Sequence, residues 1–299
     1  MRLSILARER IFGASLLIPC FIFVAAFAFY PIVYSLSLSF HKIILGLPSL
    51  GQPFIGFDNY RELLQDRIAL HSLVNTLIFV FATTFFEILF GLIIALVINK
   101  YFMGRGLARA AILVPWAVPT VVSSQMWRFI FNDKYGLLNY IFFGSDTSAY
   151  TAWLAHPSTA FAAIVVADVW KTSSFAGLLI LAGLQLIPDE LYEAAKIDGA
   201  SSWQQFKKIT LPLIKPAMLI ALLFRTMDAF RVFDLVFVMT QGGPADSTNV
   251  LQFYGYKKIF AEGLMGYGST ISVLVFLITF IISLIYIRTI GVKLFQEKG

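Results

Sequence analysis

Residues 191–212 read LYEAAKIDGASSWQQFKKITLP, a polar island between two long apolar segments. Just before it, Pro188 suits the first position of a helix, and Asp189 and Glu190 place negative charge in the positive first turn of that helix. Gly199 can end the helix in a left-handed conformation. The island is therefore predicted to begin with a short helix that lies outside the apolar segments.

The same island carries further local signals. Ala194 and Ala195 place small side chains on one side of the first helix, so that another protein can approach its backbone closely. Ser201 or Ser202 can cap a second short helix, which carries Trp203. We therefore expect two short helices joined at a glycine, with one side suited to contact with a partner.

The composition of the whole chain is that of an integral membrane protein. Hydrophobic residues make up 59% of the 299 residues, charged residues only 13%, and the mean hydropathy is +0.79. A soluble domain with this composition would be covered in apolar surface. The net charge of +6 comes from basic residues in short clusters at the ends of apolar segments. Such clusters are typical of topology signals and do not indicate a nucleic-acid partner.

Six apolar segments are each long enough for the roughly 20 residues with which a helix crosses a bilayer. The expected fold class is therefore all-α, a polytopic membrane protein with six transmembrane helices. The first segment is too long for the apolar region of a signal peptide, so we expect it to be retained. Pro115 and Pro119 predict helix breaks in the third segment, which membranes tolerate where neighbouring helices satisfy the freed backbone groups. The expected spans are residues 11–40, 72–99, 107–131, 159–185, 212–241 and 269–290.

Lysine and arginine residues predict the orientation, because cytoplasmic loops are enriched in both. They cluster in residues 1–10, in the loop around residues 100–109, in the loop 186–211 and in residues 291–299, all on one side, and the opposite loops hold fewer. We therefore expect both termini and the polar island to lie in the cytoplasm.

The spacing within the island is specific. Glu193 and two alanines are followed after three residues by Gly199, and after nine more by Ile209 and then Leu211-Pro212. This layout resembles the coupling motif with which ABC importer permeases dock into a groove on their ATPase partner. The alternative is an ordinary loop helix that lies on the membrane. The resemblance implies that the ATPase-coupling residues are Glu193, Ala194, Ala195, Asp198, Gly199 and Trp203.

Other stretches resemble the carbohydrate importer permeases of this family over nearly the whole chain. The subunit type is similar to the larger maltose permease subunit and to the actinobacterial trehalose importer permease, without the large periplasmic insertion of the enterobacterial subunit. The resemblance implies the type I ABC importer permease fold. The matching stretches are GRG at 104–106, AAILVP at 110–115, VWK at 169–171, LAGLQ at 181–185, FDL at 233–235 and TQGGP at 240–244.

The resemblance also implies partners and a location, the bacterial inner membrane. A second permease subunit would form the translocation path with this chain, and two copies of an ATPase subunit would bind ATP and Mg. An extracytoplasmic sugar-binding protein would contact Gly242, Gly243 and Pro244, although glycine and proline are equally typical of a simple turn. The substrate would be a sugar or polyol such as trehalose, maltose, glucosylglycerol or glycerol phosphate, and membrane lipid would surround the spans.

The chain lacks the sequence motifs of catalytic sites. It contains no G-x-x-x-x-G-K-[ST] phosphate loop, no G-x-S-x-G elbow and no H-E-x-x-H pair. With Cys20 as its single cysteine, the chain has no intrachain disulfide and no cysteine-based metal site. His41, His71 and His156 fall in predicted loops or at helix edges. We therefore expect no enzyme activity, no cofactor and no metal in this chain, so that ATP would be hydrolysed by another polypeptide.

Ionisable residues occur inside the fourth and fifth apolar segments, where they are costly and usually face the interior of a bundle or a wet cavity. Asp168, Lys171 and Thr172 are spaced i, i+3, i+4 in the fourth segment. In the fifth, Arg225 and Asp228 are spaced with Ala229 and Val232 at i, i+3, i+4, i+7, so each set follows one helical face. Alignment with maltose-type permeases puts these positions at the sugar site of the family, where Trp170 would pack on a pyranose ring. The expected substrate-binding residues are Asp168, Trp170, Lys171, Thr172, Arg225, Asp228, Ala229 and Val232.

Two alternatives remain open for these charges. In the first, Arg225 with Asp228, Asp228 with Arg231 and Arg231 with Asp234 are i, i+3 ion pairs that neutralise each other between packed helices. We favour this interpretation for Arg231 and Asp234, and expect Glu87 in the second span to be a helix-packing acid with a hydrogen-bond partner. In the second, acids at membrane depth indicate an ion-coupled secondary transporter. Such transporters usually show two matching halves, and the chain has no convincing internal repeat.

Overall fold

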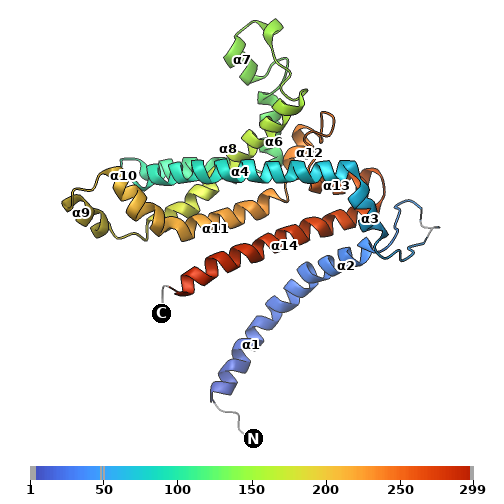
Figure 1. The fold of residues 1–299 in the computed structure, drawn as a ribbon, viewed down its shortest axis with the longest axis horizontal. Coiled ribbons are helices and arrows are strands. Elements are labelled where there is room, and N and C mark those ends of the chain that lie inside the picture. The colour runs from blue at the N-terminus through green and yellow to red at the C-terminus, as the bar shows by residue number, and fades with distance from the viewer. Residues whose placement is uncertain (1–4, 48, 50, 297–299) are drawn as a thin grey trace. The chain divides into compact units, whose positions relative to one another are not determined.

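The computed structural model describes residues 5–47, 49 and 51–296, and it is predominantly helical (Figure 1). Within these residues, β structure is limited to two isolated bridges, His41 with Phe54 and Ile44 with Leu264. The chain divides into two units, Met1–Gln65 with Gly255–Leu274 and Asp66–Tyr254 with Val275–Gly299. Of the expected terminal segments, residues 1–4 and 297–299 lie outside the described residues.

The first unit begins with a long helical run. It consists of α1 (Ile5–Val24), the π-helical turn η1 (Ala25–Phe29) and α2 (Tyr30–Ser39). The remaining elements of this unit are α3 (Asp58–Gln65), the π-helical turn η5 (Lys257–Ala261) and the start of α14 (Met265–Gln296). The Ser39 carbonyl joins three of them, because it accepts hydrogen bonds from the Asn59 amide at 2.8 Å and from the Thr270 hydroxyl at 3.3 Å.

Three long helices form the centre of the second unit: α4 (Arg67–Asn99), α8 (Pro157–Leu184) and α11 (Leu211–Ala229). Small residues let them approach closely, because a Cβ added at Gly91 of α4 would lie 2.9 Å from Ala176 of α8. Small residues at the contact are typical of helices that associate within membranes. The packing buries an apolar core of Ala95, Ile98, Ile180, Leu181, Leu184, Ile214 and Ala221.

Helical segments long and apolar enough to cross a membrane account for five spans in the described residues, or six if a bent pair counts as one. The bent pair is α5 (Arg105–Ala117) with α6 (Thr120–Ile130), whose axes meet at 89°. Many large apolar side chains on the long helices are exposed, for example Phe81 at 77%. The surrounding lipid explains this exposure, since apolar side chains in contact with lipid are not exposed to water. The five single segments are Phe12–Ser39, Arg67–Asn99, Pro157–Leu184, Ser202–Ala229 and Met265–Arg288.

Two of the expected spans are broken. The third changes direction at Val118 and Pro119, because proline has no N–H and disfavours a helical conformation in the residue before it. Pro115, in contrast, stays inside α5. The fifth span was expected to continue to residue 241, but α11 ends at Ala229 and the chain becomes helical again only in α12 (Asp234–Met239).

The polar island forms α9 (Asp189–Ile197) and α10 (Ser202–Gln205). Gly199 adopts a φ of +75°, as the left-handed helix end requires. Pro188 is the cap residue before α9, and not the first residue of the helix as expected.

The second helix of the island is better defined than the sequence indicated. Ser201 is its cap, and the Ser201 hydroxyl accepts from the Gln204 amide while the Gln204 side chain accepts from the Ser201 amide. The helix is not separate from the fifth span. It continues through the π-helical turn η4 (Phe206–Thr210) directly into α11.

An extension between α6 and α8 contains α7 (Leu137–Phe143) and the 3-10 turn η3 (Thr147–Ala149). The fully buried Asn139 holds it together, because its amide group donates to the Asn132 and Thr151 carbonyls and accepts from the Trp153 indole. At η3, hydrogen bonds from the Ser148 hydroxyl and amide lower the pKa of Asp146. The last short helix of the unit is α13 (Leu251–Tyr256), which continues into the first unit.

Candidate functional site

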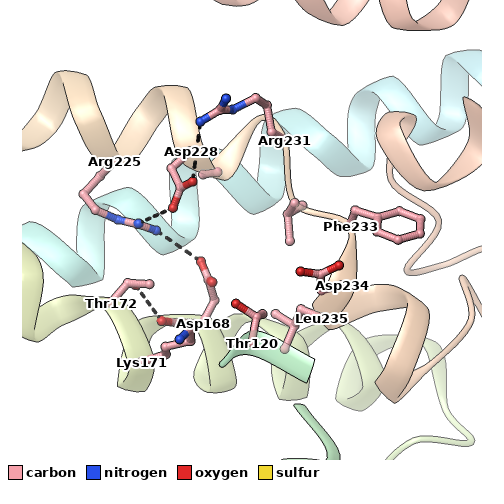
Figure 2. Close-up of a pocket in the computed structure, with 12 residues that line it drawn as sticks. Thr120, Asp168, Lys171, Thr172, Arg225, Asp228, Arg231, Phe233, Asp234 and Leu235 are labelled. Atoms are coloured by element: carbon pink, nitrogen blue, oxygen red, sulfur yellow. Dashed lines mark hydrogen bonds and ion pairs between the residues drawn. The ribbon is translucent and has the colours of Figure 1, made fainter. Parts of the chain in front are cut away.

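A polar pocket opens at the point where α11 ends. Its walls come from the first residue of α6, one face of α8, the end of α11 and the start of α12 (Figure 2). The pocket has a volume of about 120 Å³. It is lined by Thr120, Asp168, Lys171, Thr172, Arg225, Asp228, Ala229, Arg231, Val232, Phe233, Asp234 and Leu235.

Arg225 is the centre of the charged cluster beside this pocket. Its guanidinium is 3% exposed and binds the fully buried Glu87 of α4 through two hydrogen bonds, of 2.6 and 3.0 Å. It also donates to Asp228 at 2.7 Å and lies 3.5 Å from the Asp168 carboxylate (Figure 2). The planar guanidinium suits such paired contacts, since its five N–H donors lie in a fixed plane.

The cluster holds more negative than positive charge. Three carboxylates surround the buried guanidinium of Arg225. The guanidinium of Arg231, also at the pocket, is 66% exposed and lies 3.8 Å from Asp228. Burying a charge is tolerated where it is paired and hydrogen-bonded, as Glu87 is by Arg225 and by the Thr172 hydroxyl at 2.6 Å. The Glu87–Arg225 pair therefore forms the inner, structural part of the cluster.

Asp168 is the least satisfied acid of the cluster. Its side chain is 13% exposed, and its buried Oδ2 atom accepts no hydrogen bond, with Arg225 at 3.5 Å as its ion-pair partner. A buried carboxylate oxygen has capacity for several hydrogen bonds, and one without them favours an added donor. Because the Asp168 side chain also lines the pocket, its carboxylate can accept a hydrogen bond from a hydroxyl group that enters there.

The structure brings together most of the residues expected at the substrate site. Thr172, Ala229 and Val232 line the pocket with the charged residues, as their shared helical faces predicted. Trp170 does not. It lies two residues from Asp168, which points it to a different side of α8, and it lines an apolar cavity of about 620 Å³ with Phe86, Phe90 and Trp127 among others. The placement of Trp170 against a bound sugar ring is therefore not supported by this geometry.

The contacts of Lys171 and of Arg231 differ from those expected. The Lys171 ammonium does not face the carboxylates alone, because it donates to the Trp116 and Val118 carbonyls at 3.3 and 2.5 Å. The expected ion pair between Arg231 and Asp234 is not among those of the described residues, whereas Arg225–Asp228 and Arg231–Asp228 are present.

Glu87 was expected to be a packing acid, and its hydrogen-bond partners confirm this. Its pairing with Arg225, however, was not anticipated. The signal was available in the sequence, because a lone acid in an apolar span requires a cation from another helix. Arg225 is 138 residues away, which local spacing cannot reach.

The polar island is largely exposed. Glu193, Ala194, Asp198 and Gly199 are exposed, as are Ile197 at 87% and Trp203 at 68%, and Ala195 is half-buried. A Cβ added at Gly199 would meet no atom within 4 Å. The helix α9 touches the helical run of the fifth span, Ser202–Ala229, through a hydrogen bond of 2.9 Å between the Tyr192 and Thr210 hydroxyls. Every residue expected to couple to an ATPase therefore lies on or beside an accessible surface.

The loop at Gly242, Gly243 and Pro244 is a compact turn. Gly242 is buried with a φ of +83°, and a Cβ there would lie 2.9 Å from Phe253. The Asn75 amide of α4 holds the turn by donating to the Asp246 and Asn249 carbonyls. Gly242 thus has a structural role, and a partner at this loop would reach the exposed Gln241 and Ala245 more readily.

No group of three or more His, Cys, Asp or Glu side chains with the geometry of a metal site occurs among the described residues. The polar side chains that line the pocket offer hydrogen bonding and charge, from carboxylates, hydroxyls, an ammonium and guanidinium groups.

Comparison with known proteins assigns the chain to a family. Residues 87–294 match the family described as binding-protein-dependent transport system inner membrane component. The chain belongs to this family. This permease is 41% identical, over 94% of each chain, to the trehalose/maltose transport system permease protein MalF of Thermococcus litoralis. It is 39% identical to the trehalose transport system permease protein SugA of Mycobacterium tuberculosis, over 95% of this chain and 90% of that protein.

A third relative and a solved structure extend the comparison. The sulfoquinovosyl glycerol transport system permease protein SmoG of Agrobacterium fabrum is 37% identical to this chain, over 95% of this chain and 92% of that protein. A chain of the bacterial alginate ABC transporter, solved in complex with an alginate-bound periplasmic protein, matches with a TM-score of 0.79 at 20% identity, covering 94% of each chain. This likeness shows the type I ABC importer permease fold, as predicted. The polytopic, all-α membrane class is likewise confirmed.

Proposed function

We propose that this permease belongs to an ATP-driven importer of neutral α-glucosides, with trehalose and maltose as the first candidates. The observation that carries the proposal is the pocket beside Arg225, which is lined by the carboxylates of Asp168 and Asp228. It occurs in a chain about two-fifths identical to permeases named for trehalose and maltose transport. Sugar hydroxyls are the donors that such a carboxylate accepts.

Within the pocket, the residues have different roles in this proposal. Asp168 and Asp228 accept hydrogen bonds from the sugar, Thr172 supports them, and Ala229 and Val232 form the apolar part of the wall. Arg225 already contacts three carboxylates, so in this proposal it holds these acceptors in place and does not bind the sugar itself. Trp170 is left out of the site.

The second permease completes the site. Pockets for small molecules are typically about 300 to 1,000 Å³, and the volume here is about 120 Å³. One chain therefore supplies one wall of the sugar path, and the surface of a related second permease would supply the rest.

The island and the outer loops connect this path to soluble partners. Two copies of an ATPase would bind ATP and Mg, and α9 with Gly199 and Trp203 would dock on one of them at the cytoplasmic face. The exposure of these residues and the hydrogen bond from Tyr192 to Thr210 support this route into the fifth span. An extracytoplasmic sugar-binding protein would deliver the sugar on the opposite side, near Gly243 and Pro244.

The substitution Asp168→Asn tests the sugar site. Asparagine keeps the size and one acceptor but removes a charge-assisted hydrogen bond, worth about 1.5 to 3 kcal/mol, so the apparent transport constant should rise roughly ten- to a hundredfold. The measurement is sugar uptake by cells that express the whole importer, with trehalose and maltose as probes.

A surface acid provides the control. Asp58→Asn removes an exposed carboxylate that pairs with Arg61 at 3.2 Å, so it should leave uptake unchanged. If Asp168→Asn transports with wild-type sugar dependence, Asp168 does not bind the sugar.

A further inference from the structure

The Lys171 side chain connects α8 to the corner of the broken third span. Its ammonium donates to the Trp116 carbonyl at 3.3 Å and to the Val118 carbonyl at 2.5 Å. Both carbonyls belong to the end of α5, immediately before the 89° turn into α6. The lysine therefore binds backbone groups of the corner, although it also lines the pocket.

The corner needs such a donor for a physical reason. The last carbonyls of a helix have no intrahelical partner, and Pro119 has no N–H to offer. An unsatisfied backbone group is costly inside a membrane, where water is absent. An ammonium has three donors and no acceptor, and its charge complements the negative end of the helix dipole of α5.

Other contacts fix the corner on both sides. One turn after Lys171 on the same face of α8, the Phe175 ring stacks on Trp116 with centroids 5.4 Å apart. Beyond the break, the Ser123 and Ser124 hydroxyls donate to the Thr120 carbonyl at 3.0 and 2.7 Å. Thr120 is the first residue of α6 and one of the residues of the pocket wall (Figure 2).

We propose that Lys171 is a positioning residue that fixes the corner between α5 and α6 and thereby holds Thr120 in the wall of the pocket. Two of its three donors are bound to the corner, so its role in this proposal is to position the corner and not to bind the sugar. The proposal rests on the proposed function only in assuming that the pocket binds sugar. The contact between Lys171 and the corner can be tested without any sugar.

Hydrogen–deuterium exchange of the assembled importer, measured by mass spectrometry without substrate, tests the corner directly. The amides of Val118 and Ser123 report it, because they bond the Val114 and Pro119 carbonyls on either side of the break. In Lys171→Met the exchange of residues 116–124 should rise about tenfold or more, as expected for the loss of hydrogen bonds to a charged group.

Two variants control this measurement. Lys171→Arg keeps charge and donors and should restore slow exchange. Lys215→Met removes an exposed lysine of α11 and should leave the corner unchanged. If Lys171→Met does not assemble, Lys171→Gln replaces it, because glutamine keeps two donors without the charge and should give an intermediate exchange rate.

Two outcomes would overturn the proposal. Unchanged exchange in Lys171→Met, or in Lys171→Gln if that variant replaces it, together with weaker sugar dependence, would make Lys171 a sugar donor. Slow exchange regained when Asp168→Asn is added to the same variant would show that Lys171 only balances the charge of Asp168. The exchange rates at the corner are measured without sugar, so they test this proposal even if the sugar assay fails. A failure of the proposed function can therefore be distinguished from a failure of this proposal.

Uptake kinetics separate positioning from general structural support. If Lys171 acts through Thr120, Thr120→Ala and Lys171→Met should raise the apparent transport constant by less in combination than the product of their separate effects, since residues that act together are not additive. Fully multiplicative effects would contradict the link to Thr120.

Discussion

Arg225 is buried, and the carboxylates that it contacts differ in their exposure to water. Its guanidinium is 3% exposed and Glu87 is fully buried, whereas Asp228 at the pocket's edge is 59% exposed. An uncompensated charge is far more costly in the interior than at a solvated edge. The acids of the cluster therefore differ in what they contribute, with Glu87 supporting the fold and Asp228 remaining available for binding.

This difference predicts two unequal substitutions. Arg225→Met leaves Glu87 as an unpaired buried charge, so the importer should lose about 3 to 5 kcal/mol of stability. Asp228→Asn removes a half-exposed partner and should cost less than about 1 kcal/mol. Thermal unfolding of the purified importer measures both, and equal losses would contradict the assignment of Glu87 as the main partner of Arg225.

Sequence spacing predicted the residues of the pocket better than their partners. The i, i+3 rule correctly paired Arg225 with Asp228, and the shared faces brought Asp168, Thr172 and Ala229 to one pocket. The rule reaches only one or two turns along a helix, so it could not find Glu87. It also could not show that Lys171 points to backbone carbonyls, because these depend on where the third span bends.

At the scale of elements, helix ends provide the surfaces to which we assign a function. The pocket lies where α11 stops, the corner lies between α5 and α6, and the polar island separates α8 from the fifth span. A helix end exposes backbone groups and turns the chain, which a continuous span cannot do. The long helices α4 and α8 supply the packed frame against which these ends are held.

Gly199 allows the coupling role of the island to be tested at this scale. Its φ of +75° makes any side chain strained, by about 1 to 2 kcal/mol, but no atom of the chain lies near its Cβ position. Gly199→Trp should therefore still reach the membrane, while the bulky ring blocks docking and abolishes uptake. Uptake and the amount of ATPase that copurifies are the measurements.

Gly104 offers a matched control. It has a φ of +86° and equally open surroundings, and it precedes α5 on the same expected side of the membrane, outside the island. Gly104→Trp carries the same strain and should retain uptake. Wild-type uptake in Gly199→Trp, or equal loss in both variants, would remove the argument for docking at the island.

Local signals predicted the island and the bend of the third span at Pro119, but not the end of α11. Gly199 and Ser201 occupy the end and cap positions that their chemistry favours, and Pro119 marks the bend of the third span. The end of α11 has no proline or glycine, since residues 230–233 read FRVF. No local helix-breaking residue therefore marks this end of α11, and it could not be predicted from the sequence.

At the scale of the whole molecule, this chain is one part of an assembly. Its pocket is smaller than a sugar site requires, it carries no phosphate-binding loop, and its polar island is exposed without a partner in this chain. In the proposed function, each of these features corresponds to a different additional subunit. The central claim is therefore that ATP, bound elsewhere, drives sugar through a path to which this permease contributes one wall.

Uptake into proteoliposomes tests that claim most directly. The purified importer is reconstituted with ATP and Mg inside the vesicles, with the sugar-binding protein and labelled trehalose or maltose outside. We predict uptake that requires ATP and the binding protein, continues when ionophores abolish all ion gradients, and is lost in Gly199→Trp. Uptake that proceeds without ATP and stops with ionophores would contradict the account and support an ion-coupled secondary transporter.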